Sequence, residues 1–340
     1  MSREYRRFFL QTVIYTSLAC IVFLLGSEAR KELFRTDGFL SSDNRSLSQH
    51  QHPSLFDRLA ALQLSTASVP SKLIHLGTDP MLVLTPRPTL QSDVGMCTAM
   101  HGKYAERYQT AFDSHVKHSE IHGYPIYVLD RPIIDGLWSK EAALLEVLLH
   151  EMSKPDVARL RWLMWFDADT LVTNPFIPAE TFLPPFDLDD VHLLATEDWN
   201  GLNNGVFLMR VSAWSIKLLS NILAYPSYRP DETLPFTEQS AMERWVQDPL
   251  FAHGCVYVPP RWFNSYPRGE DQEWSKYQVG KGDMMMHFAG VSGRCEAIRA
   301  WHDRIVEEAD EWEIPVTKSG LPEEASSFWL DVRMQRENHF

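Results

Sequence analysis

The hydrophobic positions of this chain fall into short apolar runs separated by longer amphipathic stretches. The most apolar run, residues 162–166, is rich in aromatic residues and is bounded by charged ones. It is too short for an independent helix, so it predicts a strand buried on both faces, as in a parallel sheet covered by helices. Asp167 and Asp169 follow where this strand should end. Ligands of open α/β sheets lie outside the carboxyl ends of the strands, which makes these carboxylates candidates for chemistry.

The same pattern predicts alternating strands and helices upstream of this run. Strands are predicted at residues 94–100 and 124–129, and helices at residues 104–122 and 140–152. Gly123 should end the first helix, and Ser139 should cap the second. Because a strand, helix, strand, helix, strand order implies right-handed crossovers, we expect an α/β fold with a mostly parallel central sheet flanked by helices. The folded domain should begin near Asp93.

Downstream of the two carboxylates the predicted elements are shorter. Strands are predicted at residues 191–195, 206–209, 256–258 and 284–288, and helices at residues 213–224, from residue 238 onward and at residues 295–312. Ser212 and Thr237 should cap the first two of these helices, and Pro226 should end the first. Residues 201–205 carry two glycines and two asparagines, which predicts a turn where the backbone approaches a ligand closely. Beyond Pro315 the chain is polar, which predicts a loosely held tail.

The N-terminal 35 residues have the composition of a membrane anchor. Residues 8–25 carry no charge, and as a helix of about 18 residues they would span roughly 27 Å, enough for a thin bilayer. Basic residues flank this run on both sides, so charge alone leaves the orientation open. A cleaved signal peptide is the alternative, which the lack of a small-x-small cleavage site after the run disfavours.

The residues that follow this anchor predict a stem. They are polar as far as residue 75 and lack strong periodicity. Asn44-Arg45-Ser46 is a glycosylation acceptor pattern that has meaning only in a secretory lumen, and chance explains it equally well. The predicted organisation is a cytoplasmic tail and transmembrane helix at 1–35, a stem at 36–92, a folded domain at 93–312 and a tail at 313–340.

Composition and charge narrow the classes of function. The 340 residues are 44% hydrophobic, enough for a sizeable core, and the formal net charge of −13 argues against a general nucleic-acid binder. A nucleotide ligand remains open, because a bound divalent cation offsets local negative charge. The four cysteines have neither the spacing of a zinc site nor the density of a disulfide scaffold, and buried apolar thiols are the favoured interpretation.

The paired carboxylates are the first sign of specific chemistry. Two acids spaced two residues apart at a strand end can bind one hard cation, since carboxylate oxygens suit Mg²⁺ and Mn²⁺. An acid-rich turn or helix cap is the alternative for Asp167 and Asp169. A second pair, Asp187 and Asp189, has no apolar strand before it and predicts a solvated loop.

Further polar clusters fall at strand ends or helix starts. They are Asp198 with Asn203 and Asn204, Glu238 with Gln239, and His287. Because the strand ends of one sheet converge on one edge, these clusters and the acid pair predict a single site. A divalent ion held there would neutralise the charge that builds on a diphosphate leaving group. Taken alone, His287 is interpreted as a buried core histidine rather than as a metal ligand.

Four ordered motifs make the chain resemble glycosyltransferase family 34. They are Trp-Phe-Asp-Ala-Asp-Thr at 165–170, Asn-Gly-Leu-Asn-Asn-Gly-Val-Phe at 200–207, Thr-Glu-Gln-Ser-Ala at 237–241 and His-Phe-Ala-Gly at 287–290. His-Gly-Tyr-Pro at 122–125 and Trp-Ser-Lys at 138–140 also fit. This family contains galactosyltransferases and mannosyltransferases of fungi and xyloglucan xylosyltransferases of plants. The resemblance covers about residues 93–305.

The resemblance implies a GT-A fold that binds a nucleotide-sugar, with UDP-galactose and GDP-mannose both open. It implies a Mn²⁺ ion (or Mg²⁺), transfer of a hexose with retention of configuration, and a glycan acceptor. The anchor then fits a single-pass type II protein of the Golgi or endoplasmic reticulum membrane with a lumenal catalytic domain. Other glycosyltransferases are candidate partners, and nucleic acid is not.

The resemblance also assigns roles by motif position. Asp167 would contact the ribose or the metal shell, and Asp169 and His287 would bind the metal directly. Lys140 and Arg294 are expected to meet the nucleotide or its phosphates. The remaining assignments concern the sugars: Asp198, Asn203 and Asn204 would line donor and acceptor, and Gln239 would lie on the sugar face opposite the leaving group.

One position departs from the family pattern. The family commonly has Asp before the glutamine, and this chain has Glu238. The extra methylene moves a carboxylate by about an ångström, a shift to which catalytic geometry is sensitive. With Glu238, Gln239 and Asp198 as the catalytic candidates, front-face departure and a covalent intermediate both stay open. The alternatives to an enzyme of this kind are a non-catalytic subunit that keeps the fold, and a phosphate-ester hydrolase, for which no separate nucleophile is evident.

Overall fold

The computed structural model describes residues 72–75, 81–85, 92–102, 105–269 and 275–337. The predicted membrane anchor, most of the predicted stem and the glycosylation pattern at Asn44 lie outside these ranges. Within them, no helix combines the length and apolar character needed to cross a bilayer.

A mixed eight-stranded sheet forms the centre of the described structure, in the order β1-β2-β4-β3-β5-β8-β7-β9. The strands are β1 Lys72–His75, β2 Met81–Thr85, β3 Val94–Ala99, β4 Ile126–Leu129, β5 Trp162–Phe166, β7 Leu193–Asp198, β8 Gly201–Arg210 and β9 Cys255–Tyr257. Only β3–β4, β3–β5 and β7–β9 pair in parallel, and the other four pairs are antiparallel. The prediction of a mostly parallel sheet is therefore wrong.

A hairpin between β7 and β8 explains this difference. Asp198 pairs with Gly201 across a two-residue turn, and Gly201 has a φ of 100° that favours glycine. Antiparallel strands need only such a short connection, so β8 returns beside β5 without a crossover helix. Residues 201–205, predicted as a turn, are instead the first half of β8.

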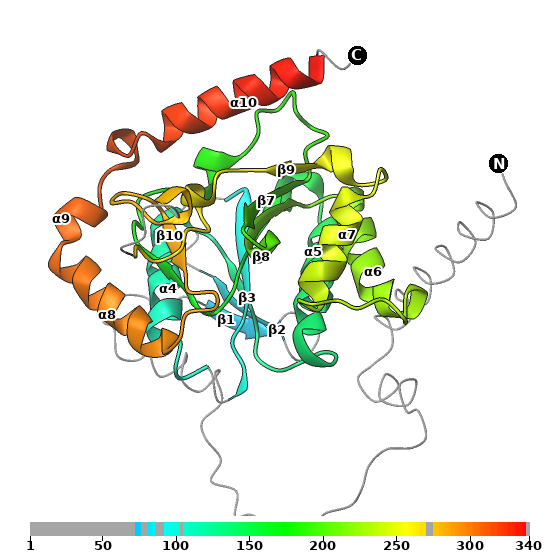
Figure 1. The fold of residues 1–340 in the computed structure, drawn as a ribbon, viewed down its shortest axis with the longest axis horizontal. Helices are drawn as coiled ribbons and strands as arrows, with labels where there is room; N and C mark the ends of the chain where they lie inside the picture. Colours follow the sequence, from blue (N-terminus) through cyan, green and yellow to red (C-terminus); the bar gives the residue numbers. More distant parts are fainter. Residues whose placement is uncertain (1–71, 76–80, 86–91, 103–104, 270–274, 338–340) are drawn as a thin grey trace, which may run out of the picture.

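Helices cover both faces of the sheet (Figure 1). The longer ones are α4 Gln109–His122, α5 Ser139–Met152, α6 Ala213–Tyr228, α7 Glu238–Gln247, α8 Arg294–Glu307 and α10 Leu321–Glu337. Helices α5, α6 and α7 lie on one side, and α4 and α8 lie on the other. The residues of β5 alternate between the two cores: Trp162, Met164 and Phe166 pack in one cluster, Leu163 and Trp165 in the other. As predicted, all five are buried.

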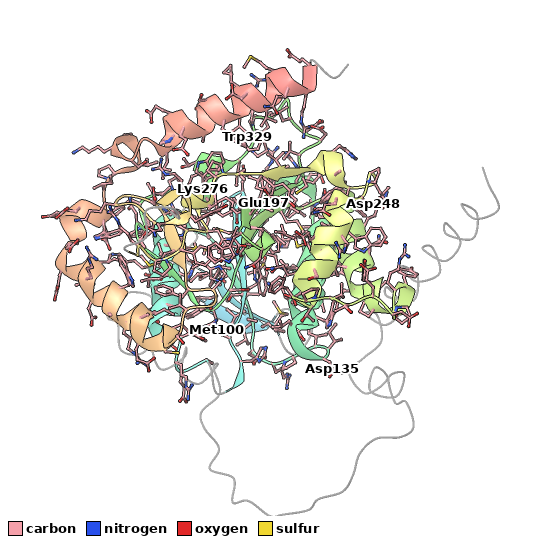
Figure 2. The ribbon with its side chains drawn as sticks, viewed as in Figure 1. Met100, Asp135, Glu197, Asp248, Lys276 and Trp329 are labelled. Carbon is pink, nitrogen blue, oxygen red and sulfur yellow. The ribbon has the colours of Figure 1, made fainter. Side chains whose placement is uncertain are left out.

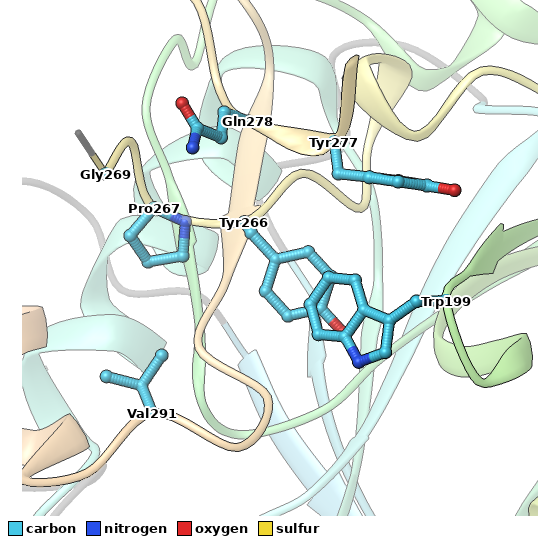
Figure 3. A pocket seen from close by; sticks show the side chains of 7 residues that line it. All are labelled: Trp199, Tyr266, Pro267, Gly269, Tyr277, Gln278 and Val291. Atoms are coloured by element: carbon cyan, nitrogen blue, oxygen red, sulfur yellow. The ribbon is translucent and has the colours of Figure 1, made fainter. Parts of the chain in front are cut away.

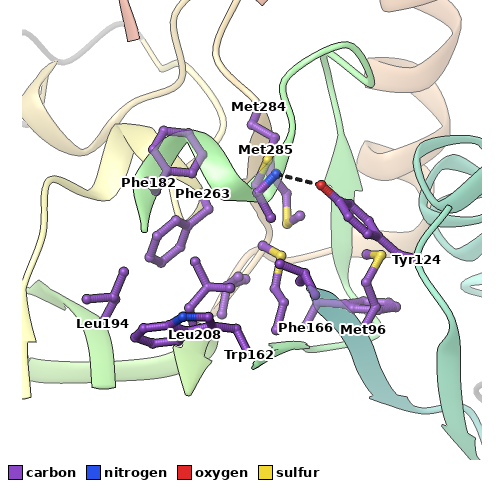
Figure 4. Close-up of a cluster of buried hydrophobic side chains, with 14 of the residues drawn as sticks. Met96, Tyr124, Trp162, Phe166, Phe182, Leu194, Leu208, Phe263, Met284 and Met285 are labelled. Carbon is purple, nitrogen blue, oxygen red and sulfur yellow. Dashed lines mark hydrogen bonds between the residues drawn. The ribbon is translucent and has the colours of Figure 1, made fainter. Parts of the chain in front are cut away.

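The first of these clusters joins the sheet to loops far away in sequence (Figure 4). It brings Met96 and Phe166 together with Phe182, Phe263 and Met285. Tyr124 lies at its edge, where its hydroxyl accepts a hydrogen bond of 3.0 Å from the backbone amide of Ala179. This packing fixes the segments that enter and leave the candidate site.

The chain reverses direction across the sheet at β3. Strands β4 and β5 flank β3 on opposite sides, and the helices that lead to them, α4 and α5, pack in separate cores on opposite faces. This arrangement is a topological switch point, the position at which open α/β sheets bind ligands. Asp167 follows β5 directly at this point.

A second, two-stranded sheet lies at the same edge. Strands β6 Thr170–Val172 and β10 Met285–His287 pair antiparallel, with His287 opposite Thr170. Because Asp169 directly precedes β6, this register places His287 beside it. The predicted strand at residues 284–288 is confirmed, and its pairing with β6 was not foreseen.

Some helix ends differ from the predictions. Gly123 ends α4 in the left-handed conformation and Ser212 caps α6, both as predicted. Ser139 does not cap α5, because its hydroxyl donates to the backbone carbonyl of Ile134 instead. Thr237 makes no capping hydrogen bond and has a φ of 52°, a strained value for a β-branched residue. Pro226 lies inside the last turn of α6, which continues to Tyr228.

The predicted loose tail is a helix that packs on the core. Trp329 of α10 is buried and donates a hydrogen bond of 3.1 Å to the carbonyl of Phe182 (Figure 2). Arg333 forms an ion pair with Asp187, at 2.7 Å, and Arg336 forms one with Asp190. The second acidic pair thus lies in an exposed loop that holds α10. The folded unit extends past residue 312, and β1 and β2 extend it upstream of the expected start at residue 93.

The three cysteines in the described ranges, Cys97, Cys255 and Cys295, are free thiols. Cys97 is buried as expected, and the other two are half-buried. Burial raises the pKa of the Cys97 thiol well above its usual range and that of Cys255 to about 12.

Candidate functional site

Asp167, Asp169 and His287 come together at the switch point. Each offers one ligand atom, and the three atoms lie within 4.8 Å of one another. Nε2 of His287 is 3.4 Å from Oδ1 of Asp169. The expectation that His287 lies beside Asp169 is confirmed, and two carboxylates with one imidazole form a donor set suited to a divalent cation.

Asn264 orients the imidazole of His287. Nδ1 of His287 is 2.9 Å from Oδ1 of Asn264, whose Nδ2 donates to Thr196 Oγ1 at 2.7 Å and to Asn203 Oδ1 at 3.1 Å. Because Nδ2 of Asn264 has acceptors, Oδ1 is the acceptor for His287, and the ring proton lies on Nδ1. In the neutral ring this tautomer directs the lone pair of Nε2 toward the carboxylates, as metal-binding histidines require.

Gly205 of β8 leaves the space that the imidazole occupies. A Cβ atom at this position would lie 2.0 Å from Cε1 of His287. The backbone of Gly205 also accepts from the amide of Asp167 at 2.7 Å and donates to Oδ1 of Asn203 at 3.0 Å. The second glycine of the 200–207 motif, Gly205, is thus required because the imidazole of His287 lies too close to the backbone for any side chain.

Charged neighbours keep the Asp169 carboxylate ionised. Burial by itself raises the pKa of Asp169, but the neighbouring ring of His287 and the guanidinium of Arg294 lower it to about 2. Arg294 is the first residue of α8, and its Nη1 forms an ion pair with Oδ2 of Asp169. Asp169 is therefore a negatively charged carboxylate at neutral pH.

Lys140 is a buried cation beneath the acid cluster. Its Nζ lies 3.3 Å from Asp167 Oδ1 and 3.5 Å from Glu238 Oε1, and it donates to the backbone and side-chain oxygens of Asn204 at 3.1 Å. Burial opposes its charged form, but the neighbouring carboxylates raise the pKa of Lys140 above its usual value. In this structure Lys140 binds carboxylates, and its predicted contact with the nucleotide stays a prediction.

The start of α7 brings Glu238 and Gln239 to the same edge. Glu238 is buried, and its Oε2 has no hydrogen-bond partner within the described part of the chain. Gln239 accepts from the amide of Asn204 through Oε1 at 3.2 Å. Glu141, next to Lys140, is a buried carboxyl that the motifs did not reveal, and burial raises its pKa well above the usual range. The start of α7 therefore contacts both Lys140, through Glu238, and β8, through Gln239.

The side chains of Asn203 and Asn204 in β8 lie on opposite faces of the sheet, because successive residues of a strand point to opposite faces. Asn204 faces Lys140 and Gln239. Asn203 donates to Asp198 Oδ2 at 2.9 Å and to the hydroxyl of Tyr266 at 3.1 Å. The predicted grouping of Asp198 with both asparagines is therefore divided between two contact networks.

Tyr266 connects the Asp198 network to the cluster of Asp167, Asp169 and His287. Its hydroxyl donates to Asp198 Oδ2 at 2.7 Å, and burial and this carboxylate raise its pKa above the usual range. Its ring stacks on that of His287, with centroids 6.4 Å apart and planes 18° apart. Neither Tyr266 nor Asn264 belongs to a motif, so local sequence held no signal for them.

Comparisons with known proteins agree with this geometry. Residues 185–298 match the model of the galactosyl transferase GMA12/MNN10 family. The probable alpha-1,2-galactosyltransferase gmh1 of Schizosaccharomyces pombe is 24% identical over 57% of this chain and 67% of its own length. An alpha-1,2-galactosyltransferase of the same yeast is 28% identical over 54% of this chain and 56% of its own length. Xyloglucan 6-xylosyltransferase 4 of Arabidopsis thaliana is 26% identical over 58% of this chain and 44% of its own length.

The chain therefore spans about half to two thirds of the length of these relatives. Among solved structures, a glycosyltransferase involved in the glycosylation of the major capsid of PBCV-1 aligns at 16% identity and a TM-score of 0.47, over 61% of this chain and 98% of that one. The family match, the named relatives and the motifs lead to one conclusion: this chain is similar to members of the galactosyl transferase GMA12/MNN10 family, glycosyltransferase family 34, and the match to the family model lies in residues 185–298.

Proposed function

We propose that this protein is a metal-dependent, retaining glycosyltransferase that moves a hexose from a nucleotide-sugar to a glycan acceptor. The observation that carries the proposal is the convergence of Asp167, Asp169 and His287 at the switch point, with Lys140 beneath them. The names of the yeast relatives favour galactose, and therefore UDP-galactose, over the GDP-mannose alternative.

The residues at the site fit a Mn²⁺ ion. Asp169 is ionised, and the contact of Nδ1 with Asn264 leaves Nε2 of His287 to bind a cation when the ring is neutral, the form in which histidine binds metal. An imidazole beside two carboxylates suits Mn²⁺ better than Mg²⁺, which prefers oxygen ligands. When bound, the ion would offset the charge that develops on the diphosphate as its bond to the sugar breaks.

The start of α8 supports the placement of a diphosphate next to these ligands. Gly290 and Gly293 have φ values of 70° and 62°, and no side-chain hydrogen bond caps the start of α8 among the described residues. A helix N-terminus and glycine-rich loop of this kind attract anions. Arg294, which pairs with Asp169, is in reach of the same phosphates.

The contacts of Glu238 favour front-face departure over a covalent intermediate. Glu238 is buried and paired with Lys140, which restrains it from attacking a sugar carbon. In the front-face route the acceptor oxygen bonds to the anomeric carbon as the bond to the diphosphate breaks. The acceptor proton passes to a diphosphate oxygen. Lys140 and Glu238 then hold Asp167, Asn204 and Gln239 in position around the donor.

We also propose a single-pass type II location in the Golgi or endoplasmic reticulum membrane. This part rests on the apolar run at residues 8–25, which precedes the described residues. Protease protection of intact microsomes tests it: the catalytic domain should survive until detergent is added, and digestion without detergent would contradict it.

A nucleotide-sugar panel tests the proposed activity. Purified protein is incubated with UDP-galactose, UDP-glucose or GDP-mannose, with and without Mn²⁺, and free nucleotide and glycosylated methyl mannoside are measured. We expect one donor to be used, only with Mn²⁺, and an α-linked product by NMR. No turnover of any donor, together with co-purification of an active partner transferase, would instead support a non-catalytic subunit.

A further inference from the structure

A pocket of about 440 Å³ has several aromatic lining residues (Figure 3), one of which, Tyr266, stacks on His287 of the candidate metal site. It is lined by Trp199, Tyr266, Pro267, Gly269, Tyr277, Gln278 and Val291. Its volume lies in the range of small-molecule sites, and nothing in the motifs pointed to it. Three of these seven residues, Trp199, Tyr266 and Tyr277, are aromatic.

Backbone pairing holds this pocket at a fixed place relative to His287. Ser265 accepts from the amide of His287 at 2.6 Å, and the next residue, Tyr266, pairs with residues 277–279 through hydrogen bonds of 2.6 and 2.9 Å. The pocket is thus an extension of the β6–β10 sheet. One ring, that of Tyr266, separates its interior from the imidazole of His287.

Trp199 contributes the most exposed ring of the pocket. It occupies the turn between β7 and β8, and 51% of its surface is exposed. Its ring lies 4.8 Å from that of Tyr266 at an angle of 37°, and 5.9 Å from that of Tyr277 at 84°. A large aromatic side chain left half exposed at a site edge indicates a ligand-contacting surface.

The chemistry of these walls matches a pyranose ring. The two faces of a hexopyranose carry C–H groups, which are apolar and pack on flat aromatic rings, while the hydroxyls around its rim need polar partners. Gln278 lines the pocket with an amide side chain, and the lining residue Tyr266 carries a hydroxyl that donates to Asp198. A planar nucleobase has no such rim of hydroxyls, so it would make fewer contacts with these polar groups.

The position of the pocket favours the acceptor over the donor. The switch point, where a nucleotide is expected, lies between β3 and β5. The β7–β8 turn that carries Trp199 lies beyond β8, on the other side of β5 from β3. If the nucleotide lies beside β3 and its diphosphate lies at Asp167, Asp169 and His287, the sugar of the donor would point toward this pocket.

We propose that the pocket lined by Trp199, Tyr266 and Tyr277 is the acceptor subsite, which binds a terminal hexopyranose of the glycan by stacking. The assignment rests on the proposed transferase function for its role as acceptor. Its sugar-binding chemistry stands on the pocket alone. The sugar that occupies it lies next to Asp198 and one aromatic ring from the metal-ligand cluster.

Saturation-transfer NMR tests this assignment without requiring turnover. The probes are the methyl α-glycosides of mannose, galactose and glucose, and sorbitol serves as a polyol without a ring face. We expect saturation of ring protons in at least one glycoside and none in sorbitol. Trp199→Ala should reduce the effect at least fivefold, and Trp199→Phe should keep most of it.

Phe186→Ala is the matched control, because Phe186 is an aromatic side chain 82% exposed that packs on Arg161 outside the pocket. It should behave as the unmodified protein does. Absence of glycoside binding, or equal binding by Trp199→Ala, would overturn the assignment. Displacement of the glycoside by UDP or GDP with Mn²⁺ would also overturn it, since the pocket would then hold nucleotide.

The same samples separate this inference from the proposed function. If the protein binds a glycoside at Trp199 but uses no nucleotide-sugar, the transferase proposal fails and the sugar site stands. In an active protein, Trp199→Ala should raise the acceptor KM at least tenfold while the Kd for UDP with Mn²⁺ stays within twofold. A tenfold loss of UDP affinity would contradict the acceptor role.

Discussion

Asn264 illustrates how a residue outside every motif controls one inside a motif. Its Oδ1 accepts the Nδ1 proton of His287, and its amide group is held by Thr196 and Asn203. The orientation of the imidazole therefore depends on a chain of hydrogen bonds that starts on β7 and β8. Outer contacts of this kind tune the metal affinity of a histidine.

Replacing Asn264 should weaken the metal site without removing a ligand. Asn264→Ala removes the acceptor for His287, and we expect Mn²⁺ affinity to fall by about 10- to 100-fold. Asn264→Asp keeps an acceptor and should lose less. Titration of each variant with Mn²⁺, followed by electron paramagnetic resonance, measures the change. Equal affinity in Asn264→Ala and the unmodified protein would show that the contact is not needed.

At the scale of single residues, the sequence predicted the candidate site best where the residue type, in its local motif, has few other functions. Asp167, Asp169 and His287 lie in local motifs, and the structure brings all three together. Asn264, Tyr266 and Glu141 act through contacts across 20 to 70 residues of sequence or through burial, neither of which a local pattern encodes. Lys140 was recognised, but its carboxylate partners became visible only in three dimensions.

Among the elements, α4 carries a cluster of buried histidines that affects stability. His118 donates through Nε2 to the carbonyl of Ile177 at 2.9 Å, and His115 contacts Thr170 Oγ1 at 2.8 Å. Burial, followed by neighbouring histidines, lowers the pKa of each to about 3. Both rings are therefore neutral in the folded protein at pH values where an unfolded chain protonates them.

This difference predicts acid sensitivity. Between about pH 6.5 and pH 3 the unfolded chain binds more protons than the folded one, so stability should fall as the pH falls through this window. His118→Gln keeps a hydrogen-bond donor for the carbonyl of Ile177. It also removes one of the two side chains that are protonated in the unfolded chain but neutral in the folded protein. The slope of unfolding free energy against pH near pH 5, from urea titrations, should decrease by about 1.4 kcal/mol per pH unit. Identical slopes would contradict the account.

Helix α10 shows where composition is misleading. Its polar residues predicted a loose tail, yet Leu321, Ala325 and Trp329 recur on one face and are buried. The spacing of three apolar residues in a polar segment is a weak signal until a complementary surface is known. Elements with long apolar runs, such as β5, were predicted well because burial on both faces leaves a strong pattern.

Trp329→Ala should therefore destabilise the protein by about 3 kcal/mol, the usual cost of removing a buried large aromatic side chain. The matched control is Arg333→Ala on the same helix, which breaks only an exposed ion pair and should cost less than about 1 kcal/mol. Urea unfolding followed by tryptophan fluorescence and circular dichroism measures both. Similar losses in the two variants would mean that charge, rather than burial, holds α10.

On the scale of the whole molecule, the candidate functional residues lie together at one edge of the sheet. Segments from β5, β8, α5, α7 and β10 meet there, and the aromatic pocket continues the same edge. An α/β class and its helices were predictable from alternating apolar periods. The mixed sheet was not, because the glycines and asparagines of residues 201–205 have the composition of a turn and hid the first half of β8, and strand pairing depends on the global register.

The central claim is that this edge binds one divalent cation through Asp167, Asp169 and His287. The most direct measurement is Mn²⁺ binding by electron paramagnetic resonance in the presence of UDP or GDP, with Asp169→Asn compared to Asp187→Asn in the second acidic pair. We predict one Mn²⁺ per chain, at least a 100-fold weaker affinity in Asp169→Asn and no change in Asp187→Asn. Absence of Mn²⁺ binding with both nucleotides, or equal affinity in the two variants, would contradict the account.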